Sequence, residues 1–303
     1  MSVGTPLPSD RPTAASHHRW LHRFLLNGPA LVVLAVWSIA PLLKTVWFSF
    51  RCYNLMEPAR TGFDGLGNYR YLFTDPGLLP AIWNTIVLIG AVLLITIGVG
   101  TLLAILFDED FFGRGVARVL VLVPFFIMPT VSALLWKNMM MHPDNGLIAF
   151  AMRSVGLRPI DWFGRFPLTS IILIVSWEWL PFAFLTLLTA VQSLDEDRKE
   201  AAKMDGAGPI AMFRYIIWPH LGRAIAATTM IETIFMLGIF AEIYVTTAGG
   251  PGFASTNLSF LIYRYVLMEY DIGGAAVASL LAIVLANILA IFLMRSFARN
   301  LEA

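Results

Sequence analysis

The sequence predicts an all-α integral membrane protein with six transmembrane helices, and three observations support this fold class. Of its 303 residues, 58% are hydrophobic and 14% are charged, whereas about a quarter of the residues in soluble domains are charged. Six stretches come close to or exceed the roughly 20 apolar residues that a helix needs to cross a bilayer. They lack the alternation of apolar and polar residues that is typical of membrane β-barrels, so we expect helices.

The first span is expected after a basic N-terminal segment, residues 1–23. Its apolar run is long and lacks a clean small-residue cleavage site, which favours an uncleaved span over a signal peptide. Several later spans contain Pro or Gly, which bundled helices tolerate because neighbouring helices satisfy the freed backbone groups. The six expected spans are Phe24–Phe48, Trp83–Phe107, Ala117–Asn138, Leu168–Val191, Ala224–Thr246 and Ala275–Met294.

The basic residues indicate the orientation of the span domain, residues 24–297. Six crossings place both termini on one side, and a small majority of Lys and Arg lies on that side, which favours the cytoplasm. The loop 193–223 and the tail 298–303 would then be cytoplasmic. The loops expected outside, which are rich in turn sequences, are 51–80, 139–167 and 247–273.

Composition and motifs exclude several functional classes. A net charge of +1 gives no strong field of either sign, so we expect no nucleic-acid partner. The single cysteine, Cys52, has no partner for a disulfide or a thiol metal site. We interpret His17, His18 and His22 as a solvated basic flank, not as metal ligands. The sequence has no G-x-x-x-x-G-K-[ST] motif, so we expect ATP to bind elsewhere.

The loop 193–223 is charged and rich in glycine, although it lies between two apolar spans. Ser193 followed by Glu196 is a capping-box pattern, which predicts the start of a short helix. Gly206 and Gly208 are expected to end that helix, because glycine interrupts helical runs and keeps the backbone open to close approach.

A second short helix is expected to begin at Pro209 and to end at Pro219, before the next span. Its apolar residues recur at helical spacing and are Ile210, Phe213, Ile216 and Ile217. The pair of helices could be a connector that lies on the membrane surface. Interleaved acidic and basic residues and the placed glycines favour a docking element for another protein.

The sequence EAA at 200–202, followed by Gly206, Ile216 and Pro219, resembles the EAA loop in the membrane subunits of binding-protein-dependent ABC importers. The family has Leu where this chain has Trp218. Further matching segments follow in the family's order, and together they resemble the carbohydrate-uptake, maltose-type permeases. These segments are GLGNYRYLF at 65–73, LVPFFIMPTVSALLWK at 122–137, HPDNGLI at 142–148, SWEWLPFAFLTLLTAVQSL at 176–194, DGAG at 205–208 and AGGPGFASTNLSFLIYRY at 248–265.

This resemblance implies a coupling-helix loop that docks on an ATP-binding subunit. The docking residues that it implies are Glu200, Ala201, Ala202, Asp205, Gly206, Arg214 and Pro219. The implied partners are a second homologous permease, two ATP-binding subunits that carry ATP and Mg, an extracytoplasmic solute-binding protein and membrane lipid. The chain itself would bind no cofactor and would not be an enzyme. The implied location is the bacterial inner membrane.

Carboxylates inside the expected spans cost several kcal/mol to insert, so they indicate a function. Glu178 lies in the fourth span, and Glu232 and Glu242 lie ten residues apart in the fifth. Carboxylates beside tryptophans suit a sugar or sugar alcohol, which offers hydroxyl pairs and C–H faces. The alternative is that such groups hydrogen-bond neighbouring helices. The full set of residues expected on the solute path is Asn84, Trp177, Glu178, Trp179, Glu232, Glu242, Tyr244 and Asn287.

Gly249, Gly250, Pro251 and Gly252 are expected to form a mobile loop that faces the solute-binding protein, with an ordinary outer turn as the alternative. An ion-coupled transporter or channel remains the second functional hypothesis, although no inverted repeat is visible. An intramembrane enzyme would need a motif such as H-E-x-x-H, which this sequence lacks. Which carbohydrate is carried stays open.

Overall fold

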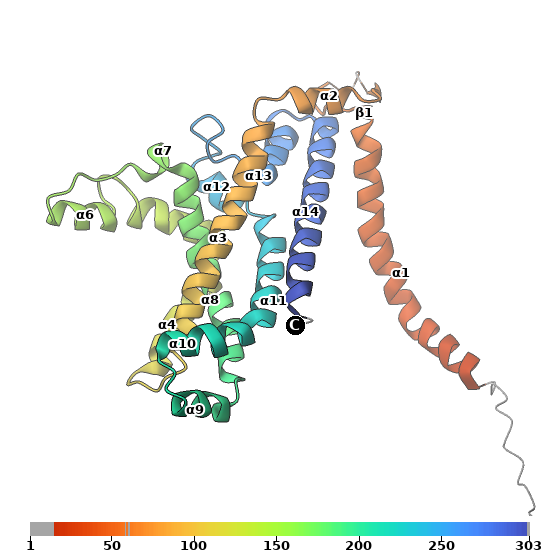
Figure 1. Cartoon of the computed structure of the whole chain (residues 1–303). Helices are drawn as coiled ribbons and strands as arrows, with labels where there is room; N and C mark the ends of the chain where they lie inside the picture. The colour runs from red at the N-terminus through yellow and green to blue at the C-terminus, as the bar shows by residue number, and fades with distance from the viewer. Residues whose placement is uncertain (1–14, 58, 60, 302–303) are drawn as a thin grey trace, which may run out of the picture.

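The computed structural model describes residues 15–57, 59 and 61–301, and it describes side chains between residues 28 and 295 of these ranges. The chain is mostly helical, and Figure 1 shows its long helices running roughly alongside one another. The long helices are α1 (Ala15–Ser49), α3 (Leu78–Leu106), α8 (Pro167–Gln192), α11 (Trp218–Met236) and α14 (Ile272–Leu301).

Short elements join the long helices. Two strands form an antiparallel hairpin in which Arg51 pairs with Phe63 and Cys52 pairs with Gly62. The short elements are β1 (Arg51–Cys52), β2 (Gly62–Phe63), α2 (Gly67–Thr74), α4 (Arg114–Leu122), η2 (Val123–Phe126), α5 (Pro129–Leu135), η3 (Trp136–Met140), α6 (Leu147–Ser154), α7 (Trp162–Arg165), α9 (Glu196–Met204), α10 (Pro209–Met212), η4 (Phe213–Ile217), α12 (Ala241–Thr246), α13 (Leu258–Tyr263) and η5 (Arg264–Met268).

The core lies between α3, α8 and α11. The α3 and α8 backbones approach closely at Gly100, where an added Cβ would lie 3.1 Å from the Cβ of Ala183. Buried apolar clusters then follow the helices along their length, one around Phe184 and Leu221 and another around Val92 and Met236. The helix that contains Glu178 is therefore held on both sides by packed neighbours.

Four helices are long and apolar enough to cross a membrane: Gly28–Ser49 within α1, α3, α8 and Ile272–Arg295 within α14. They correspond to the first, second, fourth and sixth expected spans. The third expected span, Ala117–Asn138, is not one straight helix, because two helical pieces, Arg114–Phe126 and Pro129–Met140, meet at 106°. Pro129 lacks an N–H and disfavours helical geometry in the residue before it, and Met128 is accordingly extended.

The fifth expected span, Ala224–Thr246, is also interrupted. The helix α11 ends at Met236, and the chain becomes helical again only in α12. The amide of Asn257 donates to the carbonyl of Ile239 at 2.6 Å, and the hydroxyl of Ser259 donates to the carbonyl of Leu237 at 2.6 Å. These bonds satisfy carbonyls that the break frees, which explains how an interrupted helix is tolerated here.

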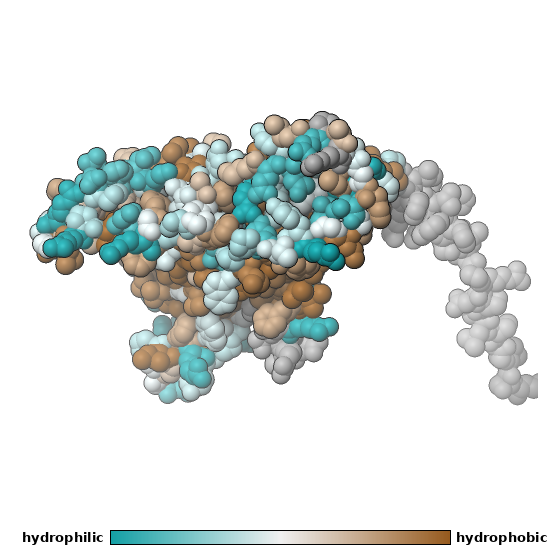
Figure 2. All heavy atoms as spheres, turned by 90° about the horizontal axis from the view of Figure 1, so that it is seen from above, coloured by the Kyte–Doolittle hydropathy of each residue, from teal (hydrophilic) through white to brown (hydrophobic). Residues whose placement is uncertain are grey.

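Figure 1 shows which elements share an end of the molecule. The first described residues of α1, the end of α14, and α9 with α10 lie at one end, whereas α2 and the hairpin lie at the other. The helices α3 and α8 run in the same direction, so the chain returns between them through the bent pair. Seen from the α2 end in Figure 2, hydrophilic side chains cover much of the molecule and hydrophobic ones gather along its middle.

The helix α1 leaves the bundle along its length. It lies beside α14 at the α2 end and diverges toward its first residues (Figure 1). None of the apolar window within Gly28–Ser49 is buried in this chain.

Candidate functional site

The first candidate site is the elbow formed by α9, α10 and η4. Its first helix is capped by Asp195, whose carboxylate accepts a hydrogen bond from the backbone N–H of Asp197 at 3.1 Å. The capping role expected for Ser193 is therefore wrong. Ser193 still belongs to the end of α8, where its hydroxyl donates to the carbonyl of Ala190 at 2.8 Å and contacts His220 at 3.1 Å.

Gly206 ends α9, as expected, and does so with a left-handed backbone of φ +80°. The N–H of Ala207 bonds to the carbonyl of Ala202 at 2.9 Å, and the N–H of Gly206 bonds to that of Lys203 at 3.0 Å. This is the Schellman pattern, in which glycine avoids the steric strain of a Cβ. An added Cβ at Gly206 would contact nothing, so the surface around the turn is open.

The second arm of the elbow continues directly into α11. The residues from Pro209 to Met236 are all helical, with a π-helical turn in η4 where the N–H of Trp218 bonds to the carbonyl of Phe213. Pro219 does not end the second helix, contrary to our expectation. The helix passes through it into α11, and the π-helical turn just before it accommodates a residue without an N–H. Figure 1 shows α10 crossing the end of the molecule and α11 rising from it.

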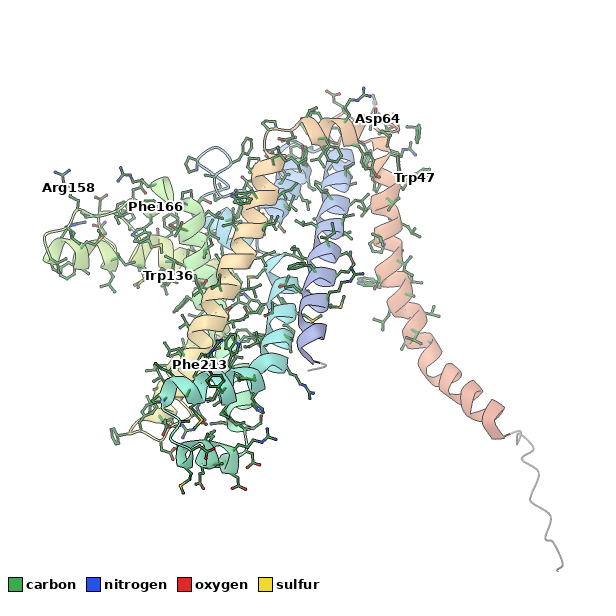
Figure 3. All side chains as sticks on the ribbon, viewed as in Figure 1. Trp47, Asp64, Trp136, Arg158, Phe166 and Phe213 are labelled. Carbon is green, nitrogen blue, oxygen red and sulfur yellow. The ribbon has the colours of Figure 1, made fainter. Side chains whose placement is uncertain are left out.

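The structure brings the predicted docking residues together on this exposed elbow. Ala202 is half-buried, and the others are exposed, namely Glu200, Ala201, Asp205, Gly206, Arg214 and Pro219. Of the predicted apolar stripe, Ile217 is buried and Phe213 and Ile216 are half-buried, whereas Ile210 is 83% exposed. Phe213, labelled in Figure 3, lies at this elbow and lines a groove along α3 together with Trp218. The elbow therefore packs on one side and is free on the other.

The second candidate site surrounds Glu178, which is 6% exposed. Its carboxyl group faces Ser132 of α5 and Glu242 of α12, which is 2% exposed. Three segments that are far apart in the sequence therefore meet at one pair of buried acids. Their juxtaposition depends on the bend before α5 and on the break before α12.

Glu232 lies in a different environment. It is fully buried, and it accepts a hydrogen bond from the hydroxyl of Thr96 in α3 at 2.7 Å. Because α11 ends between Glu232 and Glu242, the two carboxylates face different partners. Their spacing of ten residues in the sequence had not decided whether the two acids share one environment.

A cavity of about 470 Å³ adjoins Glu178 at the bend of the third span. Aromatic rings form its wall, with ring centroids 5.9 Å apart for Phe125 and Trp179 and 5.0 Å apart for Trp179 and Phe235. The cavity is lined by Pro124, Phe125, Ile127, Pro129, Glu178, Trp179, Phe182, Ile231 and Phe235. Sequence reasoning missed Phe182, although it lies four residues after Glu178 and hence on the same helix face. It also missed Phe125 and Phe235, which only the tertiary packing brings here.

The other residues expected on the path lie elsewhere. The amide of Asn84 donates to the carbonyls of Phe253 and Thr256, each at 2.9 Å. The ring of Trp177 packs against that of Trp136, which is labelled in Figure 3, with centroids 5.7 Å apart. Tyr244 packs against Phe240. Asn287 is exposed and donates to the carbonyl of Ile283 in its own helix. None of these four lines the cavity beside Glu178.

The loop 249–252 lies at the α2 end, between α12 and α13. Gly249 is buried with φ +81°, and an added Cβ would lie 2.6 Å from Cε1 of Phe260. The hydroxyl of Thr256 donates to the carbonyl of Gly249 at 3.0 Å, so hydrogen bonds fix the base of the loop. Pro251 and Gly252 are exposed at its tip. The loop therefore has a packed base and an exposed tip.

Comparison with known proteins adds to this geometry. The family described as "Binding-protein-dependent transport system inner membrane component" matches residues 78–303. The trehalose/maltose transport system permease protein MalF of Thermococcus litoralis is 32% identical over 260 residues, which cover 83% of this chain and 86% of the relative. The sn-glycerol-3-phosphate transport system permease protein UgpA of Salmonella typhimurium is 30% identical over 294 residues, with 95% and 97% covered.

Among solved structures, a chain of a bacterial alginate ABC transporter in complex with a pentasaccharide-bound periplasmic protein has a TM-score of 0.76 to this chain. The two are 23% identical, and the match covers 94% of this chain and 96% of the other, so the fold is shared. The matched family includes α3, the elbow and the acids of α8, α11 and α12. The chain therefore belongs to the family of inner membrane permease components of binding-protein-dependent transport systems.

Proposed function

We propose that this chain is a permease subunit of an ATP-driven ABC importer for a carbohydrate, a sugar or a sugar alcohol. The observation that carries the proposal is the exposed elbow, whose second arm continues without interruption into α11. A partner that moves the elbow would move a helix that contains a buried carboxylate, Glu232. Such a joint is what an ATP-binding subunit needs to act on a separate solute path.

The proposed topology has six crossings, with both termini and the loop 193–223 in the cytoplasm of a bacterial cell. The bent pair between α3 and α8 and the polar α11 would supply the third and fifth crossings. The shared location of α9, α10 and the described ends of α1 and α14 supports this arrangement (Figure 1). The apolar window of α1 within Gly28–Ser49, none of which is buried in this chain, would contact lipid or the second permease.

The proposed partners are a second homologous permease, two ATP-binding subunits and an extracytoplasmic solute-binding protein. ATP and Mg would bind to the ATP-binding subunits, and this chain would bind no cofactor and catalyse no reaction. The exposed tip of the loop 249–252 would face the solute-binding protein. The alginate transporter, solved with its periplasmic protein, supports a receptor of this kind.

The cavity beside Glu178 supports the solute class. Aromatic rings stack on the C–H faces of sugars, and a carboxyl group binds their hydroxyls. A volume of about 470 Å³ lies in the range of small-molecule sites, roughly 300–1,000 Å³. The relatives are described as carrying trehalose/maltose and sn-glycerol-3-phosphate, which are hydroxylated solutes.

The test is reconstitution of the complete importer in proteoliposomes, with labelled trehalose, sorbitol and sn-glycerol 3-phosphate offered in turn. We expect accumulation of at least one solute only when ATP, the ATP-binding subunits and the solute-binding protein are all present. Uphill accumulation by the permease chains alone, driven by an ion gradient, would establish the second hypothesis instead.

A further inference from the structure

The helix α9 is attached to the rest of the protein by very few contacts. None of its residues is buried, and it joins the chain through short turns at both ends. A helix held only at its ends would rotate or tilt when a partner pushed it. If α9 is a docking element, a contact that fixes its middle is needed for a movement of α9 to reach the long helices.

One side chain fixes the middle of α9. The ammonium of Lys199 donates to Asp108 at 2.8 Å and lies 3.3 Å from Glu196 of its own helix. The Lys199 side chain is 13% exposed and that of Asp108 is 23% exposed, so the pair is shielded from water. Among the described side chains, no other in α9 has a hydrogen bond or ion pair to a residue beyond the helix and its cap.

The partner of Lys199 belongs to a rigid part of the fold. Asp108 directly follows Phe107, which is 8% exposed and is the C-cap residue of α3. The ring of Phe107 packs against Phe184 of α8 with centroids 5.1 Å apart. A displacement of Lys199 would therefore act on the packed junction of α3 and α8, and α8 also contains Glu178 and Trp179 of the cavity.

The ion pair stays formed at physiological pH. Burial acts against the charged ammonium, but the hydrogen bonds to Asp108 and Glu196 outweigh this effect, so the pKa of Lys199 is raised. Because a raised lysine pKa keeps the group charged through the whole neutral range, the pair is a constant structural contact and not a pH switch.

We propose that the Lys199–Asp108 ion pair is the link that passes movement of α9 to α3 and α8. This inference rests on the proposed function, in which α9 docks on the ATP-binding subunit. Lys199 is then a positioning residue, distinct from the exposed docking residues that follow it. Removing either charge would leave α9 docked, but its movement would no longer pass to α3 and α8 and would reach the solute path only through α11.

The experiment measures solute transported per ATP hydrolysed by the complete importer in proteoliposomes. We expect Lys199→Gln and Asp108→Asn each to lower this ratio by roughly three-fold or more while the ATP-binding subunit still copurifies. The double variant should lose no more than either single variant, because the two residues act as one pair. Lys199→Arg, which keeps the charge, should restore the ratio.

Lys203→Gln is the matched control. It removes the same charge four residues further along α9, from an exposed side chain that has no partner among the described residues. An unchanged ratio in Lys199→Gln, or losses that add in the double variant, would overturn the link. Loss of the ATP-binding subunit from Lys199→Gln would also overturn it, since the pair would then belong to the docking surface. If even Gly206→Val leaves docking and transport intact, the proposed function itself fails.

Discussion

At the residue scale, two positions in this chain have a role that follows from local geometry. Gly206 adopts φ +80° on an open surface, so its importance is conformational and does not come from packing. Glu178 is buried beside a second acid and borders an aromatic cavity. In the proposed function, Gly206 shapes the surface on which the ATP-binding subunit docks, and Glu178 contributes a carboxyl group to the solute path.

Replacing Gly206 by Val should impair docking of the ATP-binding subunit. A β-branched residue in the left-handed region is strained by roughly 1–2 kcal/mol, so the turn between α9 and α10 would change its path. The measurement is copurification of the ATP-binding subunit together with solute uptake, and both should fall.

Gly208 supplies a matched control for this change. Its φ of −72° suits any residue, and an added Cβ would contact nothing. Gly208→Val should therefore leave docking close to normal. Equal losses in the two variants would show that bulk on the elbow matters and that the left-handed turn does not.

Replacing Glu178 by Gln should weaken uptake without dissociating the complex. A buried polar group that loses its hydrogen bond costs roughly 1–3 kcal/mol, which corresponds to about five-fold or more in apparent affinity for the solute. Uptake kinetics of the reconstituted importer measure the effect. Glu232→Gln, whose amide oxygen can still accept from Thr96, should change the kinetics less. Identical behaviour of Glu178→Gln and the unaltered chain would assign Glu178 to structure alone.

At the element scale, polar clusters hold short elements against the long helices. Asp75, which precedes α3, accepts hydrogen bonds from Arg264 of η5 and from the hydroxyl of Tyr265. It also accepts from the N–H of Gly77 at 2.6 Å. Burial and the bond to Asp75 raise the pKa of Tyr265, which keeps its hydroxyl protonated as a donor. The start of α3 is thereby joined to the segment after the loop 249–252.

Tyr265→Phe should lower the unfolding free energy by roughly 1–2 kcal/mol, because a buried hydrogen bond to a carboxylate is lost while the ring stays in place. Thermal unfolding of the purified protein in detergent measures this effect. Tyr71→Phe is the control, since Tyr71 is 54% exposed and its ring contacts that of Tyr265 without a hydroxyl bond in the structure. Equal destabilisation by both substitutions would contradict the role given to the hydroxyl.

At the scale of the whole molecule, the fold places the proposed docking surface and the proposed solute-receiving surface at opposite ends. The elbow lies at one end, and the hairpin, α2 and the loop 249–252 lie at the other (Figure 1). Between them, α8 and α11 connect the elbow to the buried acids. This separation is what a protein needs if it is driven from one side of a membrane and receives its solute on the other.

The orientation can be tested with the single cysteine. Cys52 is exposed in β1, at the end that we propose faces outward. A membrane-impermeant maleimide should label it in cells whose outer membrane alone has been opened. In a Cys52→Ser background, Lys203→Cys in α9 should react only after the inner membrane is opened. The opposite labelling pattern would reverse the proposed topology.

Particular elements show how far the sequence could predict this fold. Long apolar runs predicted α1, α3, α8 and α14 closely, because a span is defined by its own length and hydrophobicity. The third and fifth expected spans are interrupted in the structure, and the sequence did not predict where. Whether a Pro or Gly interrupts a helix depends on partners that satisfy the freed carbonyls. For the fifth span these come from Asn257 and Ser259, which local reasoning cannot supply.

The same distinction applies to the candidate sites. The sequence by itself determined the membrane class, the family and the exposed elbow whose first helix is ended by Gly206, since these depend on composition and on residues close together in the chain. Only the tertiary structure decided that Glu178 meets Glu242, that Phe125 and Phe235 complete its cavity, and that Asn84 holds the loop between α12 and α13. Such contacts join segments far apart in the sequence, and their geometry is fixed by how the helices bend and pack.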